Sequence, residues 1–513
     1  RTPILNVLRV LPTFVPPFTL LTLGIIRRQG LQNTLISYVG VGVGFLNNVF
    51  LFTHFLAKAE LGLIRLLIQV GVMVALPAAL GLPNVAARFF PGFRDRADRH
   101  GGFLWLLLSI PTALYGVVAL LFLLAKPAVL AYYAGHSELL PRYLDWVLVL
   151  GFGFLVYNLL DAYLRSLYKT VVSSLIQDVL LRLGTATAVG IYALGWVSFD
   201  GFVALFVGVN FLGTVGLAVY AAWLRQLFVW PDWRAFRGGC LAEMLRFGLF
   251  SVLGNLSNTV IATVDSLMIL RFGTDADVGV YTTAFFVTSV LLVPARSLYK
   301  IATPQVADFW HQGAIPQLAD LYRRISLLNL TAGGYLFAGL WANVDVLFRL
   351  LPPGYEQGRY VILLMGLGRL FDMATGINGV ILYTSARYRW DLFFNLSLGA
   401  LTVLSCWYFV PRYGITGAAL ASALTLVAVN IGRLAGVWGW FRMQPFTRRT
   451  LVVLGIIGAA YAAGAAVPAL GSPWLDLVAR GTVITVVYGG LLLGTKAVPD
   501  VAVLVGGVIK RVR

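Results

Sequence analysis

The chain has 513 residues, of which 59% are hydrophobic and only 12% are charged, with 39 Lys and Arg against 21 Asp and Glu. Soluble domains carry about 25% charged residues, so this composition excludes an ordinary water-soluble fold. Apolar runs of about 20 residues or more recur along the chain, and each could cross roughly 30 Å of hydrocarbon as a helix. The composition therefore predicts an all-α, polytopic membrane protein.

In chain order, residues 1–30 are apolar but interrupted by Pro12, Pro16 and Pro17, and they are expected to form an N-terminal interfacial segment. About fourteen membrane-spanning helices follow. The predicted spans cover residues 31–56, 61–83, 103–125, 145–167, 171–195, 199–224, 243–270, 278–300, 324–350, 358–384, 391–410, 414–440, 450–468 and 474–495.

An even number of spans places both termini on one side of the membrane. Lys and Arg are concentrated on that side by roughly three to one, which predicts that both termini are cytoplasmic. This bias explains most of the net charge of +18, so no nucleic-acid partner is expected. Neither the two distant cysteines, Cys240 and Cys406, nor the four scattered His residues suggest a metal site. No Walker-A pattern is present, and no cofactor is expected.

A motif of acid, apolar residue, Gly and apolar residue occurs twice, around Gly62 and around Gly279, at an offset of 217 positions. A second match relates Asn210 to Asn430 at an offset of 220. Such offsets predict two six-helix lobes followed by two extra helices. The predicted boundaries are 31–224 for the first lobe, 225–242 for a cytoplasmic linker, 243–440 for the second lobe, 441–495 for the last two spans and 496–513 for a basic cytoplasmic tail.

The two copies of this motif differ in charge. Three residues after the glycine, the first copy has Arg65 and the second has Thr282. We expect the glycines to be structural, and the difference between Arg65 and Thr282 to mark where substrate binds.

The segments Thr263–Leu270, Asp277–Tyr281 and Pro411–Ala421, together with Glu60–Leu63, resemble oligosaccharide flippases of the Wzx type. These belong to the multidrug/oligosaccharidyl-lipid/polysaccharide (MOP) exporter superfamily. The resemblance implies a V-shaped, MATE-like pair of lobes in the bacterial inner membrane. It also implies translocation of an undecaprenyl-pyrophosphate-linked oligosaccharide, a unit of O-antigen, exopolysaccharide or capsule, from the inner to the outer leaflet by alternating access. The Arg- and Gly-rich opening of lipid II flippases of the MurJ type is absent from the sequence.

The expected partners are this lipid-linked glycan, membrane lipids and polysaccharide polymerase or export machinery. A pyrophosphate calls for cations that face a cavity, and Arg is the residue best suited to grip phosphate oxygens. Four Arg lie within predicted spans and are the candidate substrate-binding residues: Arg369, Arg65, Arg182 and Arg433. Each has an alternative role, because Arg369 and Arg182 could pair with nearby acids and Arg65 and Arg433 could anchor at the membrane surface.

Four acids within spans are candidates for coupling transport to H⁺ or Na⁺: Asp265, Asp161, Asp372 and Asp178. Asp265 and Asp161 stand alone in their spans and could instead make hydrogen bonds between helices. Asp372 and Asp178 are spaced to neutralise Arg369 and Arg182 along one helix.

Two other functions remain open. A MATE-type cation-coupled multidrug antiporter would need acids and little positive charge in its cavity, and the four intramembrane Arg disfavour it. A membrane glycan polymerase or ligase would be expected to carry a long outer loop with catalytic residues, and none of the predicted outer loops is long enough. A transporter rather than an enzyme is therefore predicted.

Overall fold

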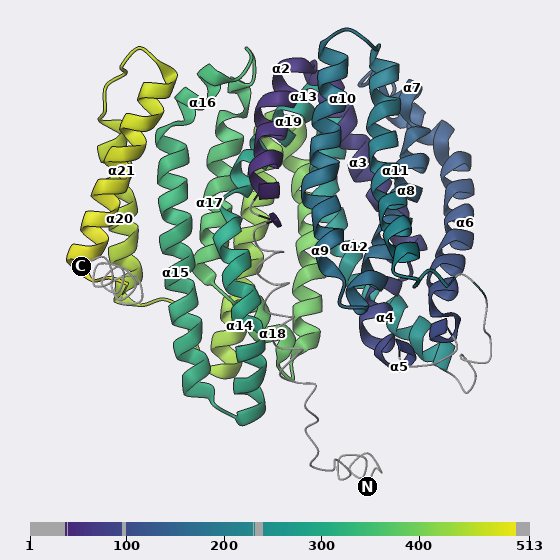
Figure 1. Ribbon diagram of the computed structural model, residues 1–513. Helices are drawn as coiled ribbons and strands as arrows, with labels where there is room; N and C mark the ends of the chain where they lie inside the picture. Colours follow the sequence, from purple (N-terminus) through teal and green to yellow (C-terminus); the bar gives the residue numbers. More distant parts are fainter. Residues whose placement is uncertain (1–35, 38, 95–98, 229, 231–239, 499–513) are drawn as a thin grey trace.

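The computed structural model describes residues 36–498, apart from 38, 95–98, 229 and 231–239, and the described chain is built of helices (Figure 1). The predicted interfacial segment, most of the linker and nearly all of the basic tail lie outside the described residues. We use "upper end" for the end of the molecule that carries α2, α7 and α16, at the top of Figure 1, and "lower end" for the end that carries α4 and α5.

The N-terminal half of the chain, through α11, forms the right-hand side of Figure 1. Its elements are η1 (Leu46–Leu51), α2 (Phe52–Phe55), α3 (Lys58–Ala78), α4 (Leu82–Phe89), α5 (Pro91–Arg94), η2 (Arg99–Gly102), α6 (Phe103–Tyr132), α7 (Leu140–Tyr143), α8 (Trp146–Ser166), α9 (Thr170–Leu175), η3 (Ile176–Leu180), α10 (Leu181–Ala193) and α11 (Phe199–Trp223).

The C-terminal half begins with α12, which lies at the centre of the molecule, and it ends with α20 and α21 at the left-hand edge of Figure 1. Its elements are α12 (Cys240–Phe272), α13 (Asp275–Ser289), α14 (Leu292–Gln312), α15 (Ile315–Ala342), α16 (Val344–Leu350), η5 (Glu356–Gly358), α17 (Arg359–Thr375), α18 (Asn378–Thr384), α19 (Tyr388–Phe441), α20 (Arg448–Ala465) and α21 (Pro473–Thr495).

The predicted all-α polytopic architecture is confirmed, but the predicted count of fourteen spans is not. Within the described residues, nine helices are long and apolar enough to cross a membrane, or eleven if each of two bent pairs is one span. Two predicted spans fall within the single 54-residue helix α19, which is broken at Gly414, where φ is 54° and ψ is −133°. The first predicted span corresponds to a shorter apolar helix, Val39–Phe55.

The outer faces of the bundle are apolar. Large aliphatic side chains stand exposed on helices of both halves, among them Leu124 on α6, Leu212 on α11, Leu404 on α19 and Leu451 on α20. So many exposed large apolar side chains are rare on soluble monomers, whereas hydrocarbon solvates them well. The chain is therefore a multi-pass membrane protein.

The acids of the repeated motif fix where α3 and α13 begin. Glu60 accepts a hydrogen bond from the backbone N–H of Ala57 at 2.8 Å. Asp277 accepts one from the backbone N–H of Thr274 at 2.9 Å, and the Thr274 hydroxyl accepts one from the N–H of Asp277 at 3.3 Å. An acid in the first turn also interacts favourably with the positive end of the helix dipole. The repeated acid is therefore a helix-starting signal.

Candidate functional site

The two copies of the repeated motif lie against each other at the upper end. A Cβ atom added to Gly62 would lie 3.0 Å from the amide nitrogen of Gly279, and one added to Gly279 would lie 3.3 Å from the amide nitrogen of Gly62. Each added carbon would also collide with a carbonyl oxygen of the facing helix, that of Asp275 or of Lys58. Glycine at both positions therefore lets the backbones of α3 and α13 touch.

Polar contacts reinforce this upper closure. Ser137 donates a hydrogen bond to Asp275 across the two halves at 2.6 Å. Arg271 Nη1 lies 2.9 Å from Nε2 of His136, which must be the acceptor because a guanidinium has only donors. The upper end is thus closed by contacts from both halves.

A cation–π contact also crosses the upper closure. The ammonium of Lys58 lies 5.6 Å from the ring centroid of Tyr355. Burial raises the pKa of Tyr355 to about 12, although the charge of Arg65 acts in the opposite direction. Tyr355 is therefore neutral near pH 7, and the contact is not an ion pair.

The halves also meet at the lower end, where the loop before α4 meets α12. A Cβ atom on Gly81 would collide with the carbonyl oxygen of Gly248, and one on Gly248 would collide with that of Leu80. The guanidinium of Arg88 lies 4.5 Å from the ring centroid of Phe247 on α12. Contacts at both ends therefore enclose the space between them.

A cavity of about 140 Å³ lies between these two closures, bounded by α3 of one half and by α12 and α13 of the other. Its lining combines one cation, one carboxylate, neutral polar groups and aromatic rings: Arg65, Gln69, Asp265, Ser266, Tyr281, Thr282, Phe285 and Phe286. Arg65 and Thr282, which hold equivalent positions in the two motifs, line the same cavity. Of the eight candidate site residues, Arg65 and Asp265 are the two that line it.

The guanidinium of Arg65 contacts two uncharged residues of the N-terminal half. It donates a hydrogen bond to the side-chain oxygen of Asn48, and its guanidinium lies 5.5 Å from the ring centroid of Phe52. Neither partner is charged, so the positive charge of Arg65 is not neutralised by an ion pair within the described residues. A cation held in this way is available to an anionic ligand.

Asp265 is buried at 4% exposure and receives three hydrogen bonds. Its Oδ2 accepts from the hydroxyls of Tyr281 at 2.5 Å and Ser422 at 2.7 Å, and its Oδ1 accepts from the thiol of Cys406 at 3.2 Å. These contacts are the hydrogen bonds between helices that the sequence offered as the alternative role of Asp265. The described residues include no ion-pair partner for its carboxylate. Cys406 and Ser422 lie on α19, on the two sides of the break at Gly414.

Arg369 lies behind the cavity wall. It is 5% exposed, its Nη1 donates a long hydrogen bond to the carbonyl oxygen of Phe285 at 3.4 Å, and its guanidinium lies 4.4 Å from the ring centroid of the same residue. Phe285 lines the cavity and Arg369 does not, so Arg369 contacts a lining residue rather than the cavity itself. The alternative ion pair between Arg369 and Asp372 is not among the ion pairs of the described residues.

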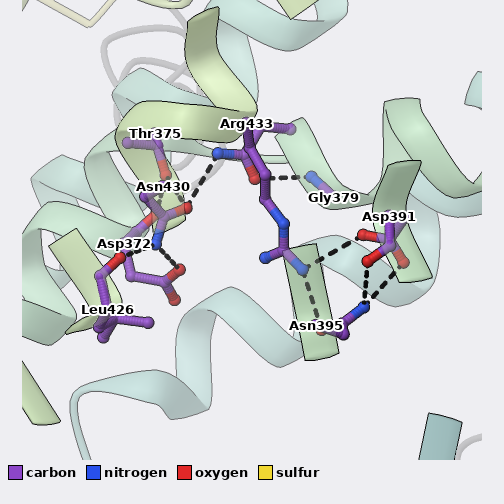
Figure 2. Close-up of polar contacts among 9 residues, drawn as sticks. Asp372, Thr375, Gly379, Asp391, Asn395, Leu426, Asn430 and Arg433 are labelled. Carbon is purple, nitrogen blue, oxygen red and sulfur yellow. Dashed lines mark hydrogen bonds and ion pairs between the residues drawn. The ribbon is translucent and has the colours of Figure 1, made fainter. Parts of the chain in front are cut away.

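Asp372 instead belongs to a polar network centred on Asn430 of α19 (Figure 2). The Asn430 amide donates to Asp372 at 2.8 Å, and its oxygen accepts from Thr375 at 3.0 Å and from Asn378 at 2.9 Å. Every polar atom of the Asn430 side chain is thus engaged within the C-terminal half. The network therefore joins α17, α18 and α19.

Arg433, one turn further along α19, points to the opposite side of the network in Figure 2. Its Nη2 forms an ion pair with Asp391 at 3.2 Å and donates to the side-chain oxygen of Asn395 at 3.0 Å. Arg433 is therefore neutralised by Asp391, a residue outside the set predicted from the sequence.

The remaining candidates pair within the N-terminal half. Arg182 lies 3.9 Å from Asp178 and donates to the carbonyl oxygen of Gly40, which ties α10 to the first apolar helix. Asp161 forms an ion pair with Arg165 and accepts from the hydroxyl of Ser173. The spacing of Arg182 and Asp178 correctly suggested a pair along one helix.

A larger groove of about 700 Å³ lies away from this cavity, among α15, α17 and α20. Its lining is mostly aliphatic and aromatic, with Arg448 its one charged residue, at the start of α20. None of the eight candidate residues lines it, so the small cavity between the halves is the candidate site.

Comparison with known proteins agrees with this fold. No family model matches the chain. A curated relative, the probable low-salt glycan biosynthesis flippase Agl15 of Haloferax volcanii, is 22% identical over 421 residues, which cover 79% of this chain and 82% of the relative.

Two solved structures share the fold. The lipid II flippase MurJ in an inward closed conformation has a TM-score of 0.71 at 11% identity and covers 91% of this chain and 99% of its own. A MATE family multidrug resistance transporter of the MOP superfamily, in an inward-facing conformation, has a TM-score of 0.61 at 16% identity. The match covers 83% of this chain and 99% of the transporter. The chain thus shares its fold with these two transporters, including the MurJ flippase whose Arg- and Gly-rich opening the sequence does not show.

Proposed function

We propose that this chain is a flippase that moves an undecaprenyl-pyrophosphate-linked oligosaccharide from the inner to the outer leaflet of the bacterial inner membrane by alternating access. The observation that carries the proposal is Arg65, a guanidinium with no ion-pair partner among the described residues, on the wall of a cavity between the two halves. A guanidinium fork binds phosphate oxygens in two parallel hydrogen bonds. The names of Agl15 and MurJ, which refer to a glycan pathway and to lipid II, support a lipid-linked glycan as the cargo.

Contacts between the halves at two ends support alternating access. The Gly62–Gly279 contact closes the upper end and the Gly81–Gly248 contact closes the lower end. Drug-sized ligands occupy pockets of about 300–1,000 Å³, so a cavity of about 140 Å³ is too small for a pyrophosphate that carries a sugar. We infer that the two contacts separate in turn, each enlarging the cavity toward one side of the membrane.

We assign the lower end to the cytoplasm. Several of the Lys and Arg that the sequence predicts to be cytoplasmic lie at helix ends there, such as Lys169 before α9, Arg387 before α19 and Arg448 at the start of α20. Positive residues are retained on the cytoplasmic side during insertion. In this orientation, the α3–α13 contact is the gate on the outer side.

We assign ion coupling, to either H⁺ or Na⁺, to Asp265. It is the candidate acid that lines the cavity and has no ion-pair partner in the described chain. Asp161 and Asp178 are engaged with Arg165 and Arg182, and Asp372 is engaged with Asn430. A change in the charge of Asp265 would alter its hydrogen bonds to α13 and to both parts of α19, which is how an ion could act on the gate.

The second candidate function, a cation-coupled drug antiporter of the MATE type, is favoured by the same carboxylate in the cavity. Arg65 argues against it, because it would repel the cationic compounds that such a cavity would have to accept. The two functions predict opposite behaviour when Arg65 is removed: flipping of an anionic lipid would fall, and binding of a cationic drug would rise.

The test is a strain that lacks this chain. Undecaprenyl-linked glycan is expected to accumulate on the inner leaflet, and the wild-type gene should restore export. Arg65→Ala should be present in the membrane at the wild-type level yet restore export poorly. If the glycan reaches the outer leaflet at the normal rate without this chain, the proposed function is wrong.

A further inference from the structure

Three polar atoms without hydrogen-bond partners among the described residues belong to side chains that line the same small cavity. They are Nε of Arg65, the side-chain oxygen of Gln69 and the hydroxyl of Ser266. Each of these atoms is buried, and a buried polar atom without a partner lowers stability. All three side chains line one cavity, so a ligand that enters as the cavity enlarges can complete these hydrogen bonds.

Their positions place a neutral polar pair beside a cation. Gln69 follows Arg65 by four residues, so the two side chains lie on the same face of α3, about 5–6 Å apart at Cβ. Ser266 comes from α12 and is 1% exposed. The neighbouring carboxylate of Asp265 is already engaged by three donors. The groups left for a ligand are therefore donors of the Arg65 guanidinium, among them the buried Nε–H, together with an amide oxygen and a hydroxyl.

The donor and acceptor pattern identifies the ligand class. Arg65 Nε needs an acceptor, which a phosphate oxygen supplies, but the Gln69 oxygen needs a donor, and an ionised pyrophosphate has none. A metal cation would be repelled by Arg65. A sugar hydroxyl or acetamido group both donates and accepts, and the rings of Phe285 and Phe286 provide apolar walls for a sugar face.

We propose that Gln69 and Ser266 form a subsite for the hydroxyl or acetamido group of the first sugar, next to the pyrophosphate held at Arg65. The proposal rests on the function proposed above and extends it: the chain distinguishes a glycosylated lipid pyrophosphate from the bare one. The first sugar is bonded directly to the pyrophosphate, so one helical turn between Arg65 and Gln69 matches the order of the two groups in the substrate.

The test is binding of two defined lipids to the full chain in nanodiscs, undecaprenyl pyrophosphate and undecaprenyl-pyrophosphoryl N-acetylglucosamine. Wild type should bind the glycosylated lipid more tightly. Gln69→Leu and Ser266→Ala should each raise the Kd for the glycosylated lipid about tenfold, which is the effect of losing one good hydrogen bond. Both variants should leave the Kd of the bare lipid within about twofold, which also demonstrates that they are folded.

The matched controls are Gln305→Leu and Ser297→Ala, which make the same changes at exposed positions of α14 and should alter neither Kd. If the two cavity variants leave both Kd values unchanged, the cavity holds only water and the subsite is overturned. An equal loss of both lipids would overturn it as well, since the contact would then be to pyrophosphate. If wild type binds neither lipid, the proposed function fails together with the subsite.

Discussion

Arg65 and Thr282 occupy equivalent positions in the two motifs and line one cavity, so the cation on α3 faces uncharged residues of α13, while the one carboxylate of the lining, Asp265, comes from α12. An anionic group that enters this space would be held by α3 more strongly than by α13. Its release would therefore depend on how α3 moves relative to the C-terminal half.

Asp265→Asn should separate binding from energy coupling. The substitution keeps a polar side chain among Tyr281, Ser422 and Cys406 but removes the titratable group. Binding of undecaprenyl pyrophosphate should stay within about twofold of wild type, whereas flipping should no longer respond to an imposed H⁺ or Na⁺ gradient. The measurement is flipping in proteoliposomes with and without each gradient.

Asp161→Asn is the matched control for this variant. Asp161 is equally buried but is paired with Arg165 in the N-terminal half, so its substitution should leave the gradient response intact. A normal gradient response in Asp265→Asn would remove Asp265 from the coupling step.

Asn430→Leu should destabilise the protein because Asp372, Thr375 and Asn378 would lose their shared partner. Loss of a hydrogen bond to a charged group costs roughly 1.5–3 kcal/mol, which should appear as a lower Tm in detergent. Among the described residues, Asn210, its equivalent in the first half, bonds through its side chain only to the carbonyl oxygen of Phe206 in its own helix. Asn210→Leu should therefore shift the Tm much less, and equal shifts would contradict the structural role of Asn430.

Part of the site could be predicted from residue types alone. Arg65 and Asp265 stood out because ionisable residues are costly within spans and usually face a cavity or a partner. Gln69, Ser422 and Cys406 could not be found in this way, since uncharged polar residues are common in membrane helices and their contacts cross between distant segments. One signal was present: Gln69 follows Arg65 by one turn on the same face.

At the scale of elements, α3 and α13 each begin with an acid that accepts a hydrogen bond from a backbone N–H at the start of the helix, and the two helices are in backbone contact with each other. The repeat indicated equivalent helices, and the acids indicated helix starts, but an offset between repeats carries no information about which copies are in contact. The structure adds that Gly62 and Gly279 face one another, which makes the repeated glycine a contact between the halves.

Gly279→Leu should keep the upper end from closing, because even a Cβ there would collide with the carbonyl oxygen of Lys58. A cysteine at Ser266, in a chain whose two native cysteines are replaced, should then react faster with a membrane-impermeant thiol reagent added from the upper side. Gly208→Leu on α11 is the control, since nothing lies within 4 Å of a Cβ at that position. Unchanged labelling in Gly279→Leu would show that the α3–α13 contact does not form the gate.

At the scale of the whole molecule, apolar runs were sufficient to predict a polytopic helical bundle, because the length of a membrane helix is set by the bilayer. The apolar runs were not sufficient to predict where helices are bent or broken within a span. The bends of 50° between α13 and α14 and of 52° between α17 and α18 depend on packing between helices, which hydropathy does not report. The division into two six-helix lobes remains a prediction.

In the proposed function, Arg65 binds the pyrophosphate of a lipid-linked glycan while the two halves close around it. The most direct measurement is leaflet exchange of undecaprenyl-pyrophosphoryl N-acetylglucosamine in proteoliposomes that contain the purified chain. Wild type should move the lipid well above the protein-free rate, and Arg65→Ala should lower the rate by about tenfold or more, the effect of losing a charge-assisted hydrogen bond. Exchange at the protein-free rate with wild type, or at the full rate with Arg65→Ala, would contradict it.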